Sequence, residues 1–172
     1  MSKAFKIYIA FASAGIFLAG LAYLFIVPRY DRSEEYVAKK EGFRSVDERK
    51  QYKEIISSLV KKGVKDVSTR NEVSKGLREF SPKKKIELIT MLSFLPYDAP
   101  KPNSAATNSY ILNQIGIARR DANPNVRDMA ALLLTNFKGE EADSMLSALA
   151  DNDPSDFVRS RAKSIIADRN KK

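Results

Sequence analysis

The feature that most constrains this chain is a run of uncharged residues near its N-terminus, from Ile7 to Val27. At about 1.5 Å of rise per residue, a helix of this length spans about 30 Å, which is the hydrocarbon thickness of a bilayer. Pro28 then ends the run. Tyrosines, whose rings favour the membrane interface, stand near both ends: Tyr8, Tyr23 and Tyr30. The sequence predicts an N-terminal tail and transmembrane anchor over residues 1–28.

Two other interpretations of this run are weaker. A cleaved signal peptide has an apolar core of about 7–15 residues, which is shorter than the run in this chain. No small-x-small cleavage site stands directly after the run, because Ala12-Ser13-Ala14 lies inside it. A buried core helix seldom carries so long an uncharged segment. An uncleaved, single-pass signal-anchor is therefore favoured.

Two opposing signals bear on the side of the membrane where the rest of the chain lies. Bases are more numerous after the run than before it, and the positive-inside rule would keep the C-terminal domain in the cytoplasm. Acids are interleaved with those bases, however, and a short N-terminal region with Lys3 and Lys6 is typical of a signal-anchor that exports the C-terminal domain. We expect an extracytoplasmic domain. Residues 29–45 would form a charged juxtamembrane segment, with Glu35 and Lys39 at the helical i, i+4 spacing.

Missing residue types exclude much chemistry. The 172 residues include no Cys, no His and no Trp. The sequence therefore offers no disulfide, thiolate nucleophile, imidazole base or Ser–His–Asp triad, and no Cys or His ligand for a metal. Its closest carboxylate groupings lie where helix starts and solvated faces normally carry acids: Glu34-Glu35, Glu140-Glu141 and Asp151/Asp153. We expect no enzyme, no cofactor, no metal site and no small-molecule substrate.

Beyond Pro28 the hydrophobic pattern is helical throughout, and no stretch shows the period of two that a strand requires. Ser45-Val-Asp-Glu48 has the form of a capping box and opens a helix to Lys62. Its apolar stripe comprises Tyr52, Ile55, Ile56, Leu59 and Val60. Ser81-Pro82 has the form of an N-cap followed by proline at the first helical position. Further helices are expected at about residues 68–80 and 104–120, with a loop at 96–103.

One motif occurs twice in the last third of the chain. Asp121-Ala-Asn-Pro124-Asn-Val126-Arg127-Asp-Met-Ala130 returns as Asp151-Asn-Asp-Pro154-Ser-Asp-Phe-Val158-Arg159-Ser-Arg-Ala162. The polar residue before each proline would cap a helix, the prolines would preset its first turn, and the Val and Ala side chains would face a neighbouring helix. Two more residues separate Pro154 from Val158 than separate Pro124 from Val126. The first helical turn of the second copy is therefore expected to differ from that of the first copy.

The repeated motif resembles the D-x-x-P-x-V-R-x-x-A opening of short, bacterial-style HEAT repeats over about residues 121–168. The resemblance implies an α-solenoid-like domain of stacked helix pairs over residues 46–172, in which residues 46–120 are degenerate members. It also implies structural roles for Arg127 and Arg159, because the Asp and Arg of such families tie adjacent repeats together. The fold class predicted is all-α, a transmembrane helix followed by this helical-repeat domain.

The style of the repeat also bears on localisation. It looks bacterial, and the N-terminus is not an Arg- and Ser-rich transit peptide. We therefore favour a bacterial cytoplasmic membrane, with a mitochondrial inner membrane as the alternative.

Three consecutive lysines, Lys83, Lys84 and Lys85, occupy the first turn of a predicted helix. The helix dipole opposes positive charge there by up to about 1 kcal/mol for each residue. Because this placement costs stability, we predict contact with an acidic partner or an anionic surface; solvated lysines without a role are the alternative. The chain's net charge of +9 is interleaved with acids rather than segregated, so nucleic acid is not the expected partner.

Helical-repeat arrays expose broad surfaces and usually bind proteins. The sequence therefore predicts a membrane-anchored scaffold or adaptor that binds a partner protein as an accessory subunit of a membrane-associated complex, with the bilayer contacted through residues 7–27. The alternative is a small assembly or accessory factor that acts mainly through its transmembrane helix. Small residues that would allow close helix approach recur there at a spacing of four: Ala10 and Ala14, then Gly15 and Ala19.

Overall fold

The computed structural model describes residues 33–94 and 105–171. It divides the chain into two compact units, residues 1–41 and residues 42–172. In the first unit, residues 33–40 are helical, and Lys39 Nζ lies 2.8 Å from Glu35 Oε1, as their spacing predicted. The predicted anchor and the predicted loop at 96–103 lie outside the described residues. Within those residues, no helix combines the length and the apolar character needed to cross a bilayer.

The described part of the second unit is built from helices, and no strand occurs in it. The prediction of an all-α domain is therefore confirmed. A 3-10 turn, Gly63–Lys65, follows the first of these helices. The α-helices are α2 (Val46–Lys62), α3 (Val67–Glu79), α4 (Pro82–Phe94), α5 (Ala105–Ala118), α6 (Pro124–Leu134), α7 (Glu140–Asn152) and α8 (Asp156–Asn170).

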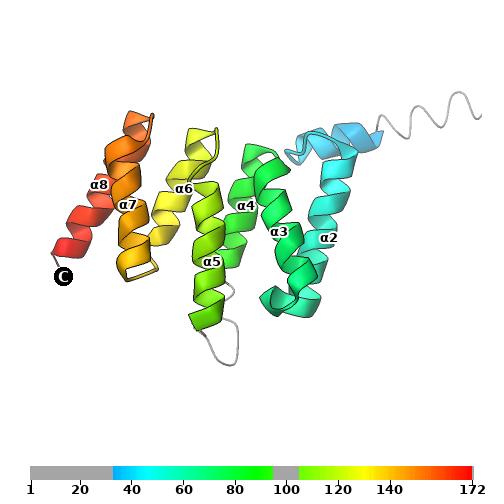
Figure 1. The fold of residues 1–172 in the computed structure, drawn as a ribbon. Coiled ribbons are helices and arrows are strands. Elements are labelled where there is room, and N and C mark those ends of the chain that lie inside the picture. Colours follow the sequence, from blue (N-terminus) through cyan, green and yellow to red (C-terminus); the bar gives the residue numbers. More distant parts are fainter. Residues whose placement is uncertain (1–32, 95–104, 172) are drawn as a thin grey trace, which may run out of the picture. The chain divides into compact units, whose positions relative to one another are not determined.

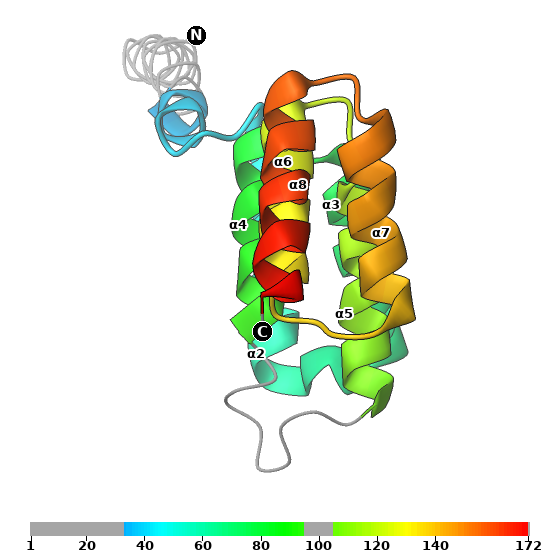
Figure 2. The same cartoon turned by 90° about the vertical axis from the view of Figure 1, so that its left-hand side faces the viewer.

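These helices follow one another along a row (Figure 1). Seen along the row, α4, α6 and α8 form one layer, and α3, α5 and α7 lie in the other (Figure 2). The packing agrees, because α6 contacts both α4 and α8, and α3 contacts α5. The loops that precede α4, α6 and α8 consequently lie at the same end of the second unit (Figure 1).

Local sequence explains where the helices begin and end. Ser45 Oγ accepts the N–H of Glu48 at 3.1 Å and so caps α2, as the capping box predicted. The other half of the box differs, because the Glu48 carboxylate accepts the N–H of Arg44 in place of that of Ser45. Asn123 Oδ1 accepts the N–H of Asn125 at 2.9 Å, and Pro124 occupies the first turn of α6. Gly63 ends α2 with a φ of 68°, a left-handed conformation that favours glycine.

A single apolar core runs through the row from α2 to α8. Its largest fully buried aliphatic side chains are Leu77, Leu88, Ile89, Leu92, Ile111, Ile115, Leu134 and Leu146. The predicted stripe of α2 is correct for Ile55 and Leu59, which are buried. It is wrong for Val60, which is 79% exposed, because α2 packs mainly against α3 and only one side of its stripe is covered.

Glu48 joins the start of α2 to the start of α4. Its carboxylate accepts the backbone N–H of Arg44 at 2.5 Å and also that of Ser81. The Ser81 hydroxyl in turn donates to the carbonyl oxygen of Gly42 at 2.8 Å. Phe43 is buried, with its ring centroid 5.4 Å from that of Tyr52. Residues 42–45, predicted as part of the juxtamembrane segment, thus belong to the second unit.

Candidate interaction site

The three consecutive lysines lie in the first turn of α4, but they do not share one environment. Lys84 Nζ is 2.7 Å from Glu87 Oε2 and 4.3 Å from the ring centroid of Phe43. Lys85 Nζ is 2.6 Å from Asp121 Oδ2. The side chains of Lys84 and Lys85 are only 8% and 11% exposed, whereas Lys83 is exposed. The structure therefore leaves only Lys83 of the three on the surface, and the predicted contact with an acidic partner stays a prediction.

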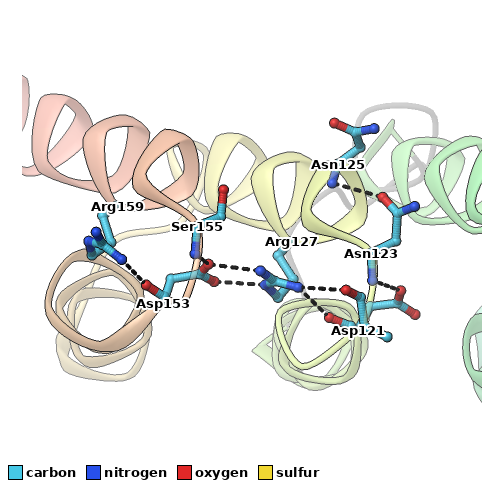
Figure 3. Close-up of polar contacts among 8 residues, drawn as sticks. Asp121, Asn123, Asn125, Arg127, Asp153, Ser155 and Arg159 are labelled. Atoms are coloured by element: carbon cyan, nitrogen blue, oxygen red, sulfur yellow. Dashed lines mark hydrogen bonds and ion pairs between the residues drawn. The ribbon is translucent and has the colours of Figure 1, made fainter.

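Arg127 forms the most completely bonded charged contact of the second unit's described residues (Figure 3). Its Nε and Nη2 donate to the two carboxylate oxygens of Asp153, at 2.8 and 2.9 Å. Its Nη1 donates to the carbonyl oxygens of Asp121 and Ala122, at 2.8 and 3.0 Å. This planar, two-pronged geometry is the strong form of an Arg–carboxylate pair, and it joins the start of α6 to the start of α8.

The start of α8 repeats the geometry of the start of α6. Arg159 Nη1 donates to the carbonyl oxygen of Asp153 at 2.5 Å, as Arg127 does to that of Asp121. The N–H of Ser155 donates to Asp153 Oδ1 at 2.9 Å, as the N–H of Asn123 does to Asp121 Oδ1 at 2.8 Å. Asp153 therefore occupies in the second copy the place that Asp121 occupies in the first.

This equivalence corrects the way in which the two copies of the motif align. Asp151, which the motif aligned with Asp121, is exposed and is not the residue that binds Arg127. Pro154 precedes Ser155, the N-cap of α8, so it does not preset the first turn as Pro124 does. The two copies differ in where the proline stands, and the cap and the arginine keep the same intervals in both.

The apolar residues of the motif lie where the sequence predicted. Val126, Ala130, Val158 and Ala162 are all fully buried in the core between the layers. The helices that carry them, α6 and α8, contact each other.

Lys85 extends the same pattern one helix pair earlier. It lies four residues after Ser81, whose carbonyl accepts its N–H, as Arg127 follows Asn123 and Arg159 follows Ser155. Lys85 reaches Asp121 of the next pair just as Arg127 reaches Asp153. We call this set the charged ladder: Lys85, Asp121, Arg127, Asp153 and Arg159.

The electrostatics of the ladder follow from its hydrogen bonds. Burial by itself would raise the pKa of Asp153, but the hydrogen bonds from Arg127 and from the N–H of Ser155 outweigh it and hold that pKa below its ordinary value. The hydrogen bond to Asp153, opposed by burial, raises the pKa of Arg127. Both shifts keep the pair charged, and its two hydrogen bonds link the start of α6 to the start of α8.

An open groove lies beside the ladder, where the C-terminal ends of α5 and α7 meet the start of α6. Its volume is about 490 Å³. Arginines from the end of α5, Arg119 and Arg120, line it together with the ladder's Asp121, Arg127 and Asp153. The sequence did not predict this groove, because its residues come from segments that are adjacent only in the folded chain.

The described residues carry many acidic side chains. No group of three or more Asp and Glu side chains that could hold a metal ion occurs among them. Glu140 and Glu141 are exposed in the first turn of α7, where a helix N-terminus favours acids.

Several residues that matter were missed from the sequence. Asp153 was predicted only as the helix cap before Pro154, a place that Ser155 takes in the structure, and its bond to Arg127 was not foreseen. Glu48 was likewise recognised only as part of a cap. The recurring interval between a helix cap and a cation four residues later is visible at Ser81 and Asn123, and it could have identified Lys85 as a ladder residue. Arg169 carried no local signal, yet it donates to the carbonyl oxygen of Phe137 at 2.6 Å and so fastens α8 to the end of α6.

Comparison with known proteins identifies no family for this chain. No family model matches the chain, and neither the curated proteins nor the solved structures compared with it gave a match.

Proposed function

We propose that this chain is a membrane-tethered scaffold or adaptor that binds a partner protein as an accessory subunit of a membrane-associated complex. The observation that carries the proposal is the charged ladder, which ties successive helix pairs together through buried ion pairs. The outer faces of the helices and the open groove beside the ladder are surfaces on which a partner can dock. Stacked helical arrays present surfaces of this kind to proteins.

The helical-repeat part of the proposal is an α-solenoid of HEAT-like pairs. It is supported by the regular spacing along the chain of residues that make equivalent contacts. Asp121 and Asp153, and likewise Arg127 and Arg159, recur after the same number of residues, and each pair makes equivalent hydrogen bonds. A repeat in which each unit contacts its neighbours is the signature of such arrays.

The membrane part of the proposal is supported by the uncharged run from Ile7 to Val27. We place the chain in a bacterial cytoplasmic membrane with the helical domain extracytoplasmic, and a mitochondrial inner membrane is the alternative location. In either location, the anchor would hold the domain at the membrane and raise its effective concentration for a partner there.

The decisive experiment is proximity crosslinking in native membranes, with the full chain beside a variant in which an unrelated single-pass segment replaces residues 1–28. Capture of the same defined protein by both chains is the expected result. If the variant reaches the membrane but loses the protein, the transmembrane helix is the binding element and the chain is an assembly factor of the alternative kind. Capture of lipid alone by both chains would contradict both functions.

A further inference from the structure

The groove between the ends of α5 and α7 holds two arginines that the fold itself does not use. Among residues 33–94 and 105–171, neither Arg119 nor Arg120 has a carboxylate partner. Arg119 Nε is buried and has no hydrogen-bond partner in the same ranges. A guanidinium is costly to bury without an acceptor, since it can donate five hydrogen bonds and accept none.

The other charges of the groove are already neutralised. Asp121 is bound by Lys85, and Asp153 is bound by two guanidinium nitrogens of Arg127. The positive charge that remains available therefore belongs to Arg119 and Arg120. The C-terminal end of α5 explains why cations are tolerated directly after it, but it leaves the Nε of Arg119 without an acceptor.

The lining also limits what kind of anion fits. Because Lys85 binds Asp121 and Arg127 binds Asp153, the charges of Arg119 and Arg120 remain without a counter-ion, and the groove favours an anionic ligand. Apolar atoms from Ala148, Leu149 and Pro154 form part of the surface, and the side-chain amide of Asn152 can both donate and accept hydrogen bonds. A peptide offers the carboxylate, the apolar contacts and the main-chain hydrogen bonds together.

We propose that this groove binds an acidic segment of a partner protein, with a Glu or Asp side chain held by Arg119 and Arg120. The inference rests on the proposed scaffold function and gives it a docking site. The two planar guanidinium groups match a carboxylate by charge and by hydrogen-bond geometry. Burial and the adjacent charge of Arg120 lower the pKa of Arg119, so an anion that neutralises this pair would remove an unfavourable feature of the unbound protein.

The test uses the full chain in detergent and a fluorescein-labelled pentaglutamate peptide, with binding followed by fluorescence anisotropy. The expected result is that Arg119→Gln/Arg120→Gln weakens binding by about tenfold or more, since two charge-assisted contacts are removed. The single exposed-site variant Arg120→Glu, which removes no buried group, is expected to weaken binding to a similar degree.

A matched control separates a specific groove from general charge. Lys61→Gln/Lys62→Gln removes the same two charges from the last turn of α2, where both lysines are exposed. It is expected to change the affinity by less than about twofold. Equal weakening by the two double variants would overturn the proposal, as would equal binding of a pentaglutamine peptide. Displacement of the peptide by inorganic phosphate at lower concentration would overturn it as well, because the groove would then be a phosphate site.

Crosslinking in native membranes distinguishes this inference from the function on which it rests. A partner captured equally by the parent chain and by Arg119→Gln/Arg120→Gln would support the scaffold function and refute the groove as its docking site. A partner captured by the parent and lost by that variant, but kept by the Lys61→Gln/Lys62→Gln control, is the result we expect.

Discussion

Arg127 and Asp153 show how charge is accommodated inside the second unit at the scale of single residues. Their side chains are 8% and 2% exposed. Removing two ions from water costs several kcal/mol each, and a buried pair is tolerated only where hydrogen bonds satisfy both partners. Four hydrogen bonds from one guanidinium achieve this here, two of them to the carboxylate. The pair therefore links the start of α6 to the start of α8 without an unsatisfied charge.

Removal of one partner from this pair is expected to destabilise the protein strongly. Asp153→Asn should lower the free energy of unfolding by about 3–5 kcal/mol, because it leaves Arg127 buried without its counter-ion. Asp151→Asn, two residues earlier and exposed, is the matched control and should change the stability by less than about 0.5 kcal/mol. Urea denaturation measures both values. Equal effects would show that Asp153 is not the ladder residue.

The same aspartate predicts how stability depends on pH. The native-state pKa of Asp153 lies below its ordinary value of 3.8, so its contribution is complete above about pH 5 and is lost progressively as the pH falls through 3.8 and the lower native value. The pKa of Glu48 is lowered as well, because its burial is outweighed by hydrogen bonds from the N–H groups of Arg44 and Ser81.

Urea titrations at pH 7, 5 and 3 test this dependence. The free energy of unfolding should fall less between pH 5 and pH 3 in Asp153→Asn than in the parent chain. An equal fall in both chains would refute the prediction.

At the scale of elements, the helices are set by local rules and joined by close packing. Caps and prolines fix where α2, α4 and α6 begin, and Gly63 fixes where α2 ends. Within the packed core, the room around a residue decides which substitutions are tolerated. A Cβ on Gly76 of α3 would lie 2.7 Å from a ring carbon of Phe80, whereas a Cβ on Gly116 of α5 would lie 3.5 Å from Met145 Cε.

These two glycines predict opposite outcomes for the same substitution. Gly76→Ala should destabilise the protein by about 1 kcal/mol or more, because the buried Phe80 ring must move and overpacking outweighs the gain in helix propensity. Gly116→Ala meets only an ordinary contact and should stabilise the protein by about 0.5–1 kcal/mol. Thermal unfolding of the two variants provides the comparison. A stabilising Gly76→Ala would mean that the Phe80 ring packs less closely against Gly76 than the structure has it.

At the scale of the whole molecule, two units of different character share one chain. The second unit is an all-helical row with one continuous core. The first contains the uncharged run that we propose as a membrane anchor. If the proposal holds, the location of the protein depends on the first unit and its recognition depends on the second.

One substitution in the run tests the anchor while leaving the helical domain unchanged. Phe17→Asp places a charge at the centre of residues 7–27, where insertion costs about 2.5–3.5 kcal/mol more. We expect the parent chain to stay with membranes during extraction at alkaline pH and a substantial share of Phe17→Asp to be released. Lys3→Asp, outside the run, is the control. A parent chain that is itself extracted would contradict the anchor.

Much of the fold was predictable because its rules are local. The capping box at Ser45, the proline starts of α4 and α6, and the helical spacing of apolar residues each depend on interactions within a few positions of the chain. Val60 shows the limit of such rules. The helical period placed it on the apolar stripe, but it lies exposed because α2 has its main neighbour on one side only.

The sequence by itself determined the all-helical class, most helix boundaries and the existence of a repeat. Only the tertiary structure decided which charges are used: Lys85 meets an aspartate 36 residues away, and Arg127 selects Asp153 over Asp151 at a distance of 26 residues. The physical reason is that helix formation is governed by neighbours along the chain. The pairing of distant charges and the grouping of Arg119 and Arg120 with α7 depend instead on how the helices pack.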